Sequence, residues 1–218
     1  MSNLLAKFLT RSFPSKETSL YAESRFTETP DSMPDSQSSV YESRAFAMWG
    51  GLLDKTTGNR ILELGALNSR SLGYFAERTA LLSVMSLSLE ESPITMQSQL
   101  DKFTPDQPFD GSLCWDLPNY MSEADFQRLG TWLGQNMRSG GAVMLCLATK
   151  IPYPKLPGRY EIVSKDRLQF QASKLETEGR QYRMSTADLG RQWEDFQVER
   201  SFLLRNGLQE YVLRRRAA

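Results

Sequence analysis

Apolar residues in the middle of the chain form short continuous runs, and segments with helical spacing separate these runs. The runs predict buried strands, and the segments between them place apolar residues on one helical face. The runs lie at residues 60–66, 80–89, 109–117 and 142–149. The two clearest helical segments lie at residues 69–79 and 122–141. This alternation predicts an α/β fold, a three-layer sandwich with a mostly parallel twisted sheet.

Some of these helices carry boundary signals. Ser122 followed by Asp125 resembles a capping box at the start of the second helix, and Gly140-Gly141 is placed to end it. Ahead of the first strand, Ser38 and Ser39 are placed to cap a further helix with its own apolar stripe.

The C-terminal third has a different pattern. A proline-rich loop leads into a short strand near residue 160, and residues 185–196 predict a helix. Two strands around Asn206-Gly207 predict an antiparallel hairpin, because this dipeptide favours a two-residue turn. Such a turn pairs Phe202 with Tyr211 and Glu199 with Arg214.

The chain divides into an arm, residues 1–38, and an α/β domain, residues 39–218. Residues 14–38 are rich in Ser, Thr, Pro and acids, which is typical of a flexible linker. Residues 1–13 fit a short helix that docks on the domain or on a partner, a mitochondrial targeting segment, or a weak membrane-surface helix. We prefer the interpretation of residues 1–13 as a docking helix, so a protein partner could bind the arm.

Composition narrows the chemistry. The 218 residues include 26 basic and 26 acidic side chains and no histidine. Balanced charge argues against nucleic acid as a partner, and the absence of histidine excludes a Ser-His-Asp triad and His-ligated zinc. We expect no metal site and no transmembrane segment. Cys114 and Cys146 lie inside apolar runs, which favours buried thiols in a cytoplasmic protein over a disulfide.

The strand ends locate the expected binding site. In an open parallel sheet, ligands bind at the carboxyl ends of the strands, near the point where the strand order reverses. The segments that follow the four predicted strands are residues 65–69, 86–90, 116–120 and 149–154.

Four features occur in a recognisable order: Glu63-Leu64-Gly65 after the first strand, FDGSLCWDLPNYM at 109–121, GGAVMLCLAT at 140–149, and the closing hairpin. This order resembles the class I S-adenosylmethionine-dependent methyltransferases over about residues 40 to 216. The hairpin also looks like that of bacterial methyltransferase-domain proteins without an assigned substrate. The resemblance implies a Rossmann-like methyltransferase fold, S-adenosylmethionine as cofactor, and methyl transfer to an acceptor, a small molecule or a protein, that the sequence does not identify.

The family's first motif is an acidic residue followed by three alternating glycines. Glu63 and Gly65 match its acid and first glycine, whereas Leu67 and Ser69 stand at the second and third glycine positions. Ser86, or Ser88 if the second predicted strand runs longer, stands where the family usually carries the acid that binds the ribose hydroxyls. Glu90 or Glu91 could take that place only if the strand ends later still. The cofactor-binding residues that the resemblance implies are Glu63, Gly65, Ala66, Asn68, Ser86 and Asp116.

A third departure is length. Fewer than twenty residues separate Leu89 from Phe109, where the family fits a helix, a strand and another helix. The fold is therefore expected to be shortened between the second and third predicted strands. Because Leu67, Ser86 and this short segment all fall on one wall of the cofactor site, they count against S-adenosylmethionine binding.

Residues 115–120, WDLPNY, follow the third predicted strand and supply the candidate catalytic residues. In the functional interpretation Asp116 orients or deprotonates a nucleophile, and Asn119 and Tyr120 position it. In the structural interpretation the same residues end a strand, form a turn and pack on the next helix.

Two functions remain open at this stage. The first is an S-adenosylmethionine-dependent methyltransferase with an unknown acceptor. The second is a non-catalytic protein of the same fold that binds or scaffolds a partner through its arm. The arginine run 214–216 could contact RNA or acidic lipid, but a solvated terminal cluster is preferred.

Overall fold

The computed structural model describes residues 38–53, 58–65, 69–78, 80–87, 96–149, 157–171, 185–205 and 207–217. Its main sheet has six strands. Their order is β3 (Leu81–Met85), β2 (Arg60–Leu64), β4 (Phe109–Trp115), β5 (Met137–Ala148), β9 (Leu208–Arg215), β8 (Phe196–Leu203). The strands β3, β2, β4 and β5 are parallel, and β9 and β8 add an antiparallel hairpin.

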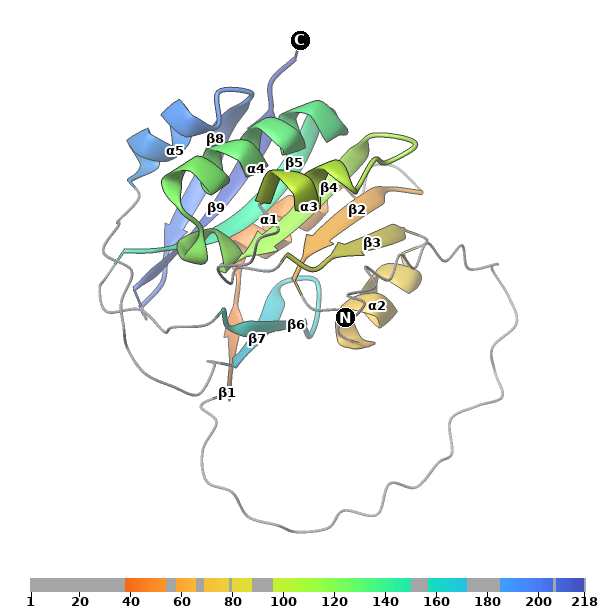
Figure 1. Ribbon diagram of the computed structural model, residues 1–218. Coiled ribbons are helices and arrows are strands. Elements are labelled where there is room, and N and C mark those ends of the chain that lie inside the picture. Colours follow the sequence, from red (N-terminus) through yellow and green to blue (C-terminus); the bar gives the residue numbers. More distant parts are fainter. Residues whose placement is uncertain are drawn as a thin grey trace, which may run out of the picture.

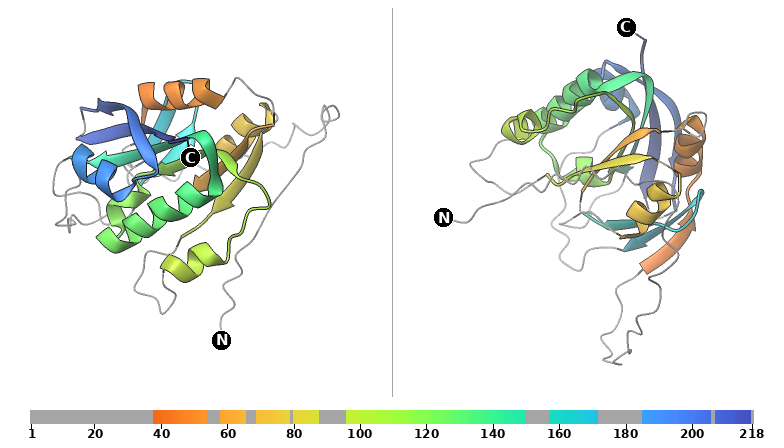
Figure 2. Two further views of the ribbon diagram at one scale, coloured as in Figure 1. Left: turned by 90° about the horizontal axis from the view of Figure 1, so that it is seen from above. Right: turned by 90° about the vertical axis from the view of Figure 1, so that its right-hand side faces the viewer.

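Helices cover both faces of this sheet (Figures 1 and 2). One face carries α3 (Met96–Asp101), α4 (Glu123–Asn136) and α5 (Thr186–Gln192). The other carries α1 (Arg44–Leu53), α2 (Ser69–Ala76) and a three-stranded antiparallel sheet. The order of that small sheet is β1 (Ser38–Glu42), β7 (Arg167–Gln171), β6 (Arg159–Ile162). The predicted three-layer α/β sandwich with a C-terminal hairpin is confirmed.

Alternation along the strands builds a separate core on each face. In β2, Leu62 and Leu64 enter the core beneath α3 and α4, whereas Ile61 enters the core beneath α1. The central strand β5 is buried on both faces from Gly141 to Leu147, as its continuous apolar run predicts. Cys114 and Cys146 are free and buried in different cores, which confirms the expected buried thiols.

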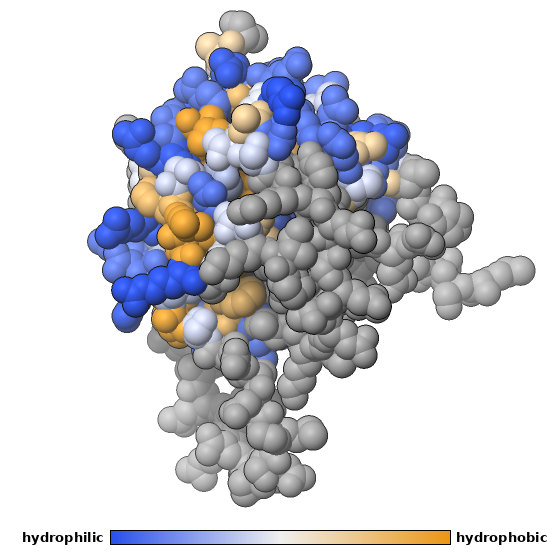
Figure 3. Space-filling view, turned by 90° about the vertical axis from the view of Figure 1, so that its left-hand side faces the viewer, coloured by the Kyte–Doolittle hydropathy of each residue, from blue (hydrophilic) through white to orange (hydrophobic). Residues whose placement is uncertain are grey.

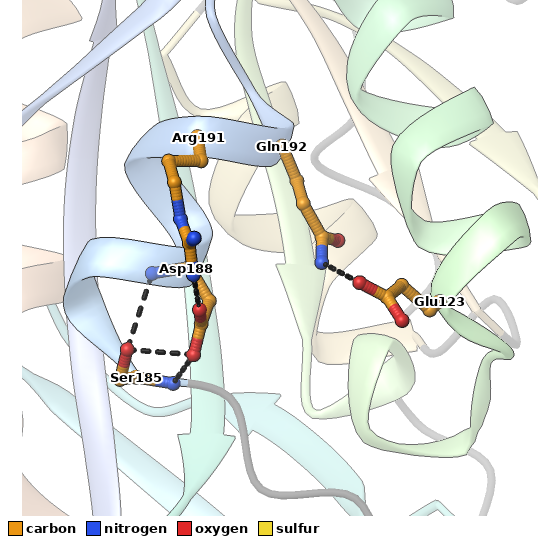
Figure 4. A network of polar contacts seen from close by, with 5 residues as sticks. All are labelled: Glu123, Ser185, Asp188, Arg191 and Gln192. Carbon is orange, nitrogen blue, oxygen red and sulfur yellow. Dashed lines mark hydrogen bonds and ion pairs between the residues drawn. The ribbon is translucent and has the colours of Figure 1, made fainter.

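Serine caps fix two helices on the α4 face. Ser122 Oγ accepts a hydrogen bond from the Asp125 amide, as predicted. Ser185 and Asp188 form a reciprocal capping box at the start of α5 (Figure 4). Gln192 on α5 donates to Glu123 on α4 at 2.9 Å, which joins the two helices.

Two predicted helix boundaries are wrong. Residues 38–42 form strand β1, because they pair with β7 far along the chain, and α1 begins only at Arg44. Its cap is Ser43, whose Oγ accepts from the Phe46 amide at 3.0 Å. At the other boundary α4 ends at Asn136, so Gly140-Gly141 lies inside β5, where Gly140 has φ 74.

The hairpin forms as predicted, but its register is shifted by one residue. Phe202 pairs with Glu210 instead of Tyr211, because three residues separate Leu204 from its partner Leu208. Gly207 has φ 87, which fits a three-residue loop that ends in a left-handed glycine. Glu199 still forms an ion pair with Arg214 at 2.9 Å, although the two residues are no longer directly paired.

The described residues between β3 and β4 agree with the predicted shortening after β3. The residues described between β3 and β4 form one helix, α3, of six residues, and residues 96–108 contain no strand. Within the described residues no helix is long and apolar enough to cross a membrane. The coloured part of the face seen in Figure 3 is mostly hydrophilic, with apolar areas between the hydrophilic residues. Among the described residues, the large apolar side chains that are exposed are Val40, Val163 and Leu203.

Candidate functional site at the strand-order reversal

The strand order reverses between β2 and β4. From β2 the chain passes to β3 on one side and then returns to β4 on the other. Because Glu63 is in register with Leu113, the residues that end β2 and β4 lie beside each other. The small sheet lies below these carboxyl ends (Figure 1), and Gly158 and Tyr160 from its side contact the end of β4. This is where open α/β sheets bind ligands.

Glu63 is a carboxyl group buried at this reversal, with 1% of its surface exposed. Its Oε1 accepts hydrogen bonds from Trp115 Nε1 at 3.0 Å and from Ser71 Oγ at 3.2 Å. Its Oε2 is buried and has no hydrogen-bond partner among the described residues. Burial raises the pKa of Glu63 to about 7, although the bonds from Trp115 and Ser71 oppose the rise. Glu63 therefore exchanges a proton near neutral pH.

Trp115, the partner of Glu63, ends β4 in a left-handed backbone conformation. Its φ is 47, and it is the only non-glycine residue in the described parts of the chain with positive φ. For a bulky side chain this conformation is strained. The indole stacks on the Tyr160 ring with centroids 5.0 Å apart and an interplanar angle of 5°, and it faces Phe46 at 6.4 Å. Trp115 therefore links β4, β6 and α1.

The predicted catalytic residues follow directly, and backbone groups engage two of them. Asp116 is 1% exposed, and its Oδ2 accepts from the Gly158 amide at 2.9 Å. Asn119, in the 3-10 helix Leu117–Tyr120, donates to the carbonyl oxygens of Asp116 and Cys146, each at 2.9 Å. Its Oδ1 accepts from the Ala148 amide at 2.8 Å. These contacts give Asp116 and Asn119 structural roles, while the catalytic roles of both residues and of half-buried Tyr120 stay predictions.

Of the predicted cofactor residues, Gly65 and Ser86 lie side by side at the ends of β2 and β3. The Gly65 amide donates to the Met85 carbonyl oxygen at 2.9 Å. Gly65 has φ 131, a conformation that side chains rarely adopt, and a Cβ added there would meet no atom of the described residues beyond its chain neighbours within 4 Å. Ser86 is exposed. Ala66 and Asn68, together with Leu67, lie outside the described residues.

The sequence prediction missed a second buried carboxyl group, Glu210 on β9. Glu210 is fully buried and accepts a hydrogen bond from Tyr41 Oη at 3.0 Å. Burial raises the pKa of Glu210, and hydrogen bonds from Ser43, Tyr41 and the Ala45 amide oppose the rise. Burial also raises the pKa of Tyr41. An acidic residue inside an apolar predicted strand is the sequence feature that could have identified Glu210, and Glu63 has the same feature.

A groove of about 370 Å³ lies between α3 and α4 and includes none of the residues at the strand reversal. Its walls are mostly polar and exposed, with Trp132 as the buried exception. No group of three or more Cys, Asp or Glu residues in the described ranges could hold a metal ion.

No family model and no curated protein matches this chain. Among solved structures it is similar to 1,6-didemethyltoxoflavin-N1-methyltransferase from Burkholderia thailandensis, with 15% identity, coverage of 79% of this chain and 77% of that chain, and a TM-score of 0.49. It is also similar to an S-adenosylmethionine-dependent methyltransferase from Clostridium acetobutylicum, with 10% identity, coverage of 79% and 90%, and a TM-score of 0.47. A third, an S-adenosylmethionine-dependent methyltransferase from Mesorhizobium loti, has 16% identity, coverage of 78% and 98%, and a TM-score of 0.46. At these identities and TM-scores no activity passes from these proteins to this chain.

Proposed function

We propose that this chain is an S-adenosylmethionine-dependent methyltransferase whose methyl acceptor is not assigned. The observation that carries the proposal is the turn Glu63-Leu64-Gly65 at the strand-order reversal. It combines a buried acid with a glycine in a conformation that side chains rarely adopt. Fold alone does not establish chemistry, so the proposal depends on this turn.

The residues at the reversal fit a cationic cofactor in two respects. Glu63 Oε2 is a buried acceptor without a hydrogen-bond partner in the described part of the chain, and it suits an ammonium or other N–H donor. No atom of the described residues beyond the chain neighbours lies within 4 Å of the Cβ position of Gly65, which would let a ligand approach the backbone. A nearby cation would favour the ionised form of Glu63 and lower its pKa.

The remaining predicted residues would complete the site. Ser86 can contribute one hydroxyl to a ribose, where an acid would contribute two acceptor oxygens. Asp116 and Asn119 would hold the end of β4 in place, because their polar atoms bond to the backbone there. Bound S-adenosylmethionine would supply the methyl group and the driving force, so the chain needs mainly to align the acceptor.

Titration calorimetry with S-adenosylmethionine and S-adenosylhomocysteine tests this function. We expect micromolar binding to the wild-type chain and a loss of at least tenfold in Glu63→Gln. The control Glu123→Gln changes an exposed carboxylate on α4 and should bind like wild type. Absence of binding at millimolar ligand to the wild-type chain would reject the proposal.

A second candidate is a non-catalytic protein that binds a partner through residues 1–38. Backbone groups already engage Asp116 and Asn119, the predicted catalytic residues, which is compatible with a protein that does not catalyse a reaction. A pull-down should compare the full chain with a chain that lacks residues 1–37 and keeps β1. If both chains recover the same partners equally, residues 1–38 do not bind the partner and the second candidate is wrong. Free thiols at Cys114 and Cys146 fit a cytoplasmic location for either candidate.

A further inference from the structure

Trp115 differs from two other buried tryptophans of this fold in what it bonds. Trp49 Nε1 donates to the Ala142 carbonyl oxygen at 3.0 Å, and Trp193 Nε1 donates to the Phe126 carbonyl oxygen at 2.9 Å. Both acceptors are neutral backbone groups. Trp115 Nε1 instead donates to an ionisable side chain, Glu63, and does so from a left-handed backbone. A tryptophan that served packing alone would need neither feature.

The indole occupies one of the two oxygens through which Glu63 could hold a ligand. Oε1 already accepts two hydrogen bonds, from Trp115 and Ser71. Oε2 is buried and has no hydrogen-bond partner in the described ranges. The protein's own donors therefore bond one of the two carboxylate oxygens of Glu63 and leave the other without a partner. This carboxylate lies at the strand-order reversal, where open α/β sheets bind ligands.

The small sheet holds the indole in this position. Trp115 stacks on Tyr160 of β6, and Tyr160 contacts Phe170 of β7 at 4.9 Å. The Gly158 amide bonds to Asp116, the next residue after Trp115. The Trp115 side chain is 6% exposed and Tyr160 is 3% exposed, so the pair shields Glu63 from solvent on that side.

We propose that Trp115 is a gate on Glu63: its indole N–H holds Oε1, so a ligand whose N–H donors engage both carboxylate oxygens displaces the indole together with the Tyr160 stack. This inference rests on the proposed function, since the ligand it admits is the cationic cofactor or an amine-bearing acceptor. Release of the strained backbone at Trp115 accompanies opening. In the protein without ligand, the site is therefore closed.

The test separates the N–H donor from the aromatic packing. Trp115→Phe keeps a ring to stack on Tyr160 and removes the donor to Glu63. We expect it to bind S-adenosylhomocysteine about tenfold more tightly than wild type, because one competing hydrogen bond to an ionisable group is gone. The matched control is Trp193→Phe, which loses an equivalent buried N–H bond on the opposite face of the sheet and should bind like wild type.

A second measurement works without any variant at position 115. Fluorotryptophan incorporated into the wild-type chain gives four fluorine resonances, for Trp49, Trp115, Trp132 and Trp193. Single Phe variants of the other three residues assign the Trp115 resonance. On saturation with S-adenosylhomocysteine we expect this resonance to move and those of Trp132 and Trp193 to stay.

The outcomes of these two measurements separate the gate from the methyltransferase proposal. Equal affinity of wild type and Trp115→Phe, or an unmoved Trp115 resonance in a saturated protein, overturns the gate and leaves the methyltransferase proposal intact. No binding to either protein overturns both proposals. Binding to Trp115→Phe alone overturns both, because the ligand then cannot displace the indole in the wild-type chain. Should that variant fail to fold, the wild-type resonance decides.

Discussion

The pH dependence of stability tests the environment of Glu63 most directly. Burial raises the pKa of Glu63 to about 7 from an ordinary value of 4.5. The native state therefore keeps a proton between these values, whereas the unfolded chain releases it. Stability from this group is fully present below pH 4.5 and is lost as the pH rises through 7. Glu63→Gln removes the titration and keeps an oxygen that can accept from Trp115 and Ser71.

The size of the effect follows from the shift. A difference of about 2.5 pKa units, at about 1.36 kcal/mol per unit, corresponds to about 3.4 kcal/mol of stability between low pH and pH 8. Because Glu63 is 1% exposed, solvent screens little of this cost. The side-chain amide that Glu63→Gln introduces adds an unpaired N–H₂ group, whose cost does not depend on pH. Relative to the variant, wild type should lose roughly 2 to 4 kcal/mol from pH 4.5 to pH 8.

Urea unfolding of both proteins at half-unit steps from pH 4.5 to pH 8.5 measures this difference. The raised pKa of Glu210 acts equally in both proteins and cancels. Glu123→Gln, at an exposed position on α4, serves as the control and should follow the wild-type profile. Parallel profiles for wild type and Glu63→Gln would refute the reasoning, because they would mean that Glu63 stays ionised in the native state.

Three further predictions concern residues that pack or cap the elements around the site. Gly130→Ala should lower the melting temperature, at a cost of about 1 to 3 kcal/mol, since its Cβ would collide with the Trp193 indole. Gly73→Ala, where a Cβ meets no atom of the described residues within 4 Å, should stabilise the protein by about 0.5 to 1 kcal/mol in the same scan. Asn119→Ala should cost about 2 to 4 kcal/mol in urea unfolding, because it removes bonds to the β5 backbone, and an unchanged stability would leave catalysis as its role. Ser185→Ala should cost about 1 kcal/mol through loss of the α5 cap, with equal melting curves contradicting the capping box.

Local sequence patterns predicted the elements whose partners lie close in the chain. The alternation that gives β2, α2 and β3 is visible in the hydrophobic pattern, and so are the Ser122 cap and the hairpin. The hairpin register was not predictable, since Asn206-Gly207 fits loops of two or three residues and the difference shifts every pairing by one.

Contacts between residues far apart in the chain determined the features that the local hydrophobic pattern did not predict. Residues 38–42 have the composition of a helix start, and only pairing with β7 makes them a strand. The same holds for the candidate site. Glu63 and Gly65 were identifiable from one turn, but the stack of Trp115 on Tyr160 joins residues 45 positions apart and leaves no local signal. Tertiary contacts override local propensity at such positions.

The small sheet also constrains how the chain can be made. Strand β1 leaves the ribosome early, yet its partner β7 follows only about 125 residues later, and the Tyr41 contact on β9 lies 169 residues away. At synthesis rates of about 5 to 20 residues per second, β1 waits roughly 6 to 25 s with an unpaired edge. The small sheet can therefore form only after the four parallel strands of the main sheet have been made, and the hairpin of β8 and β9 then completes the main sheet.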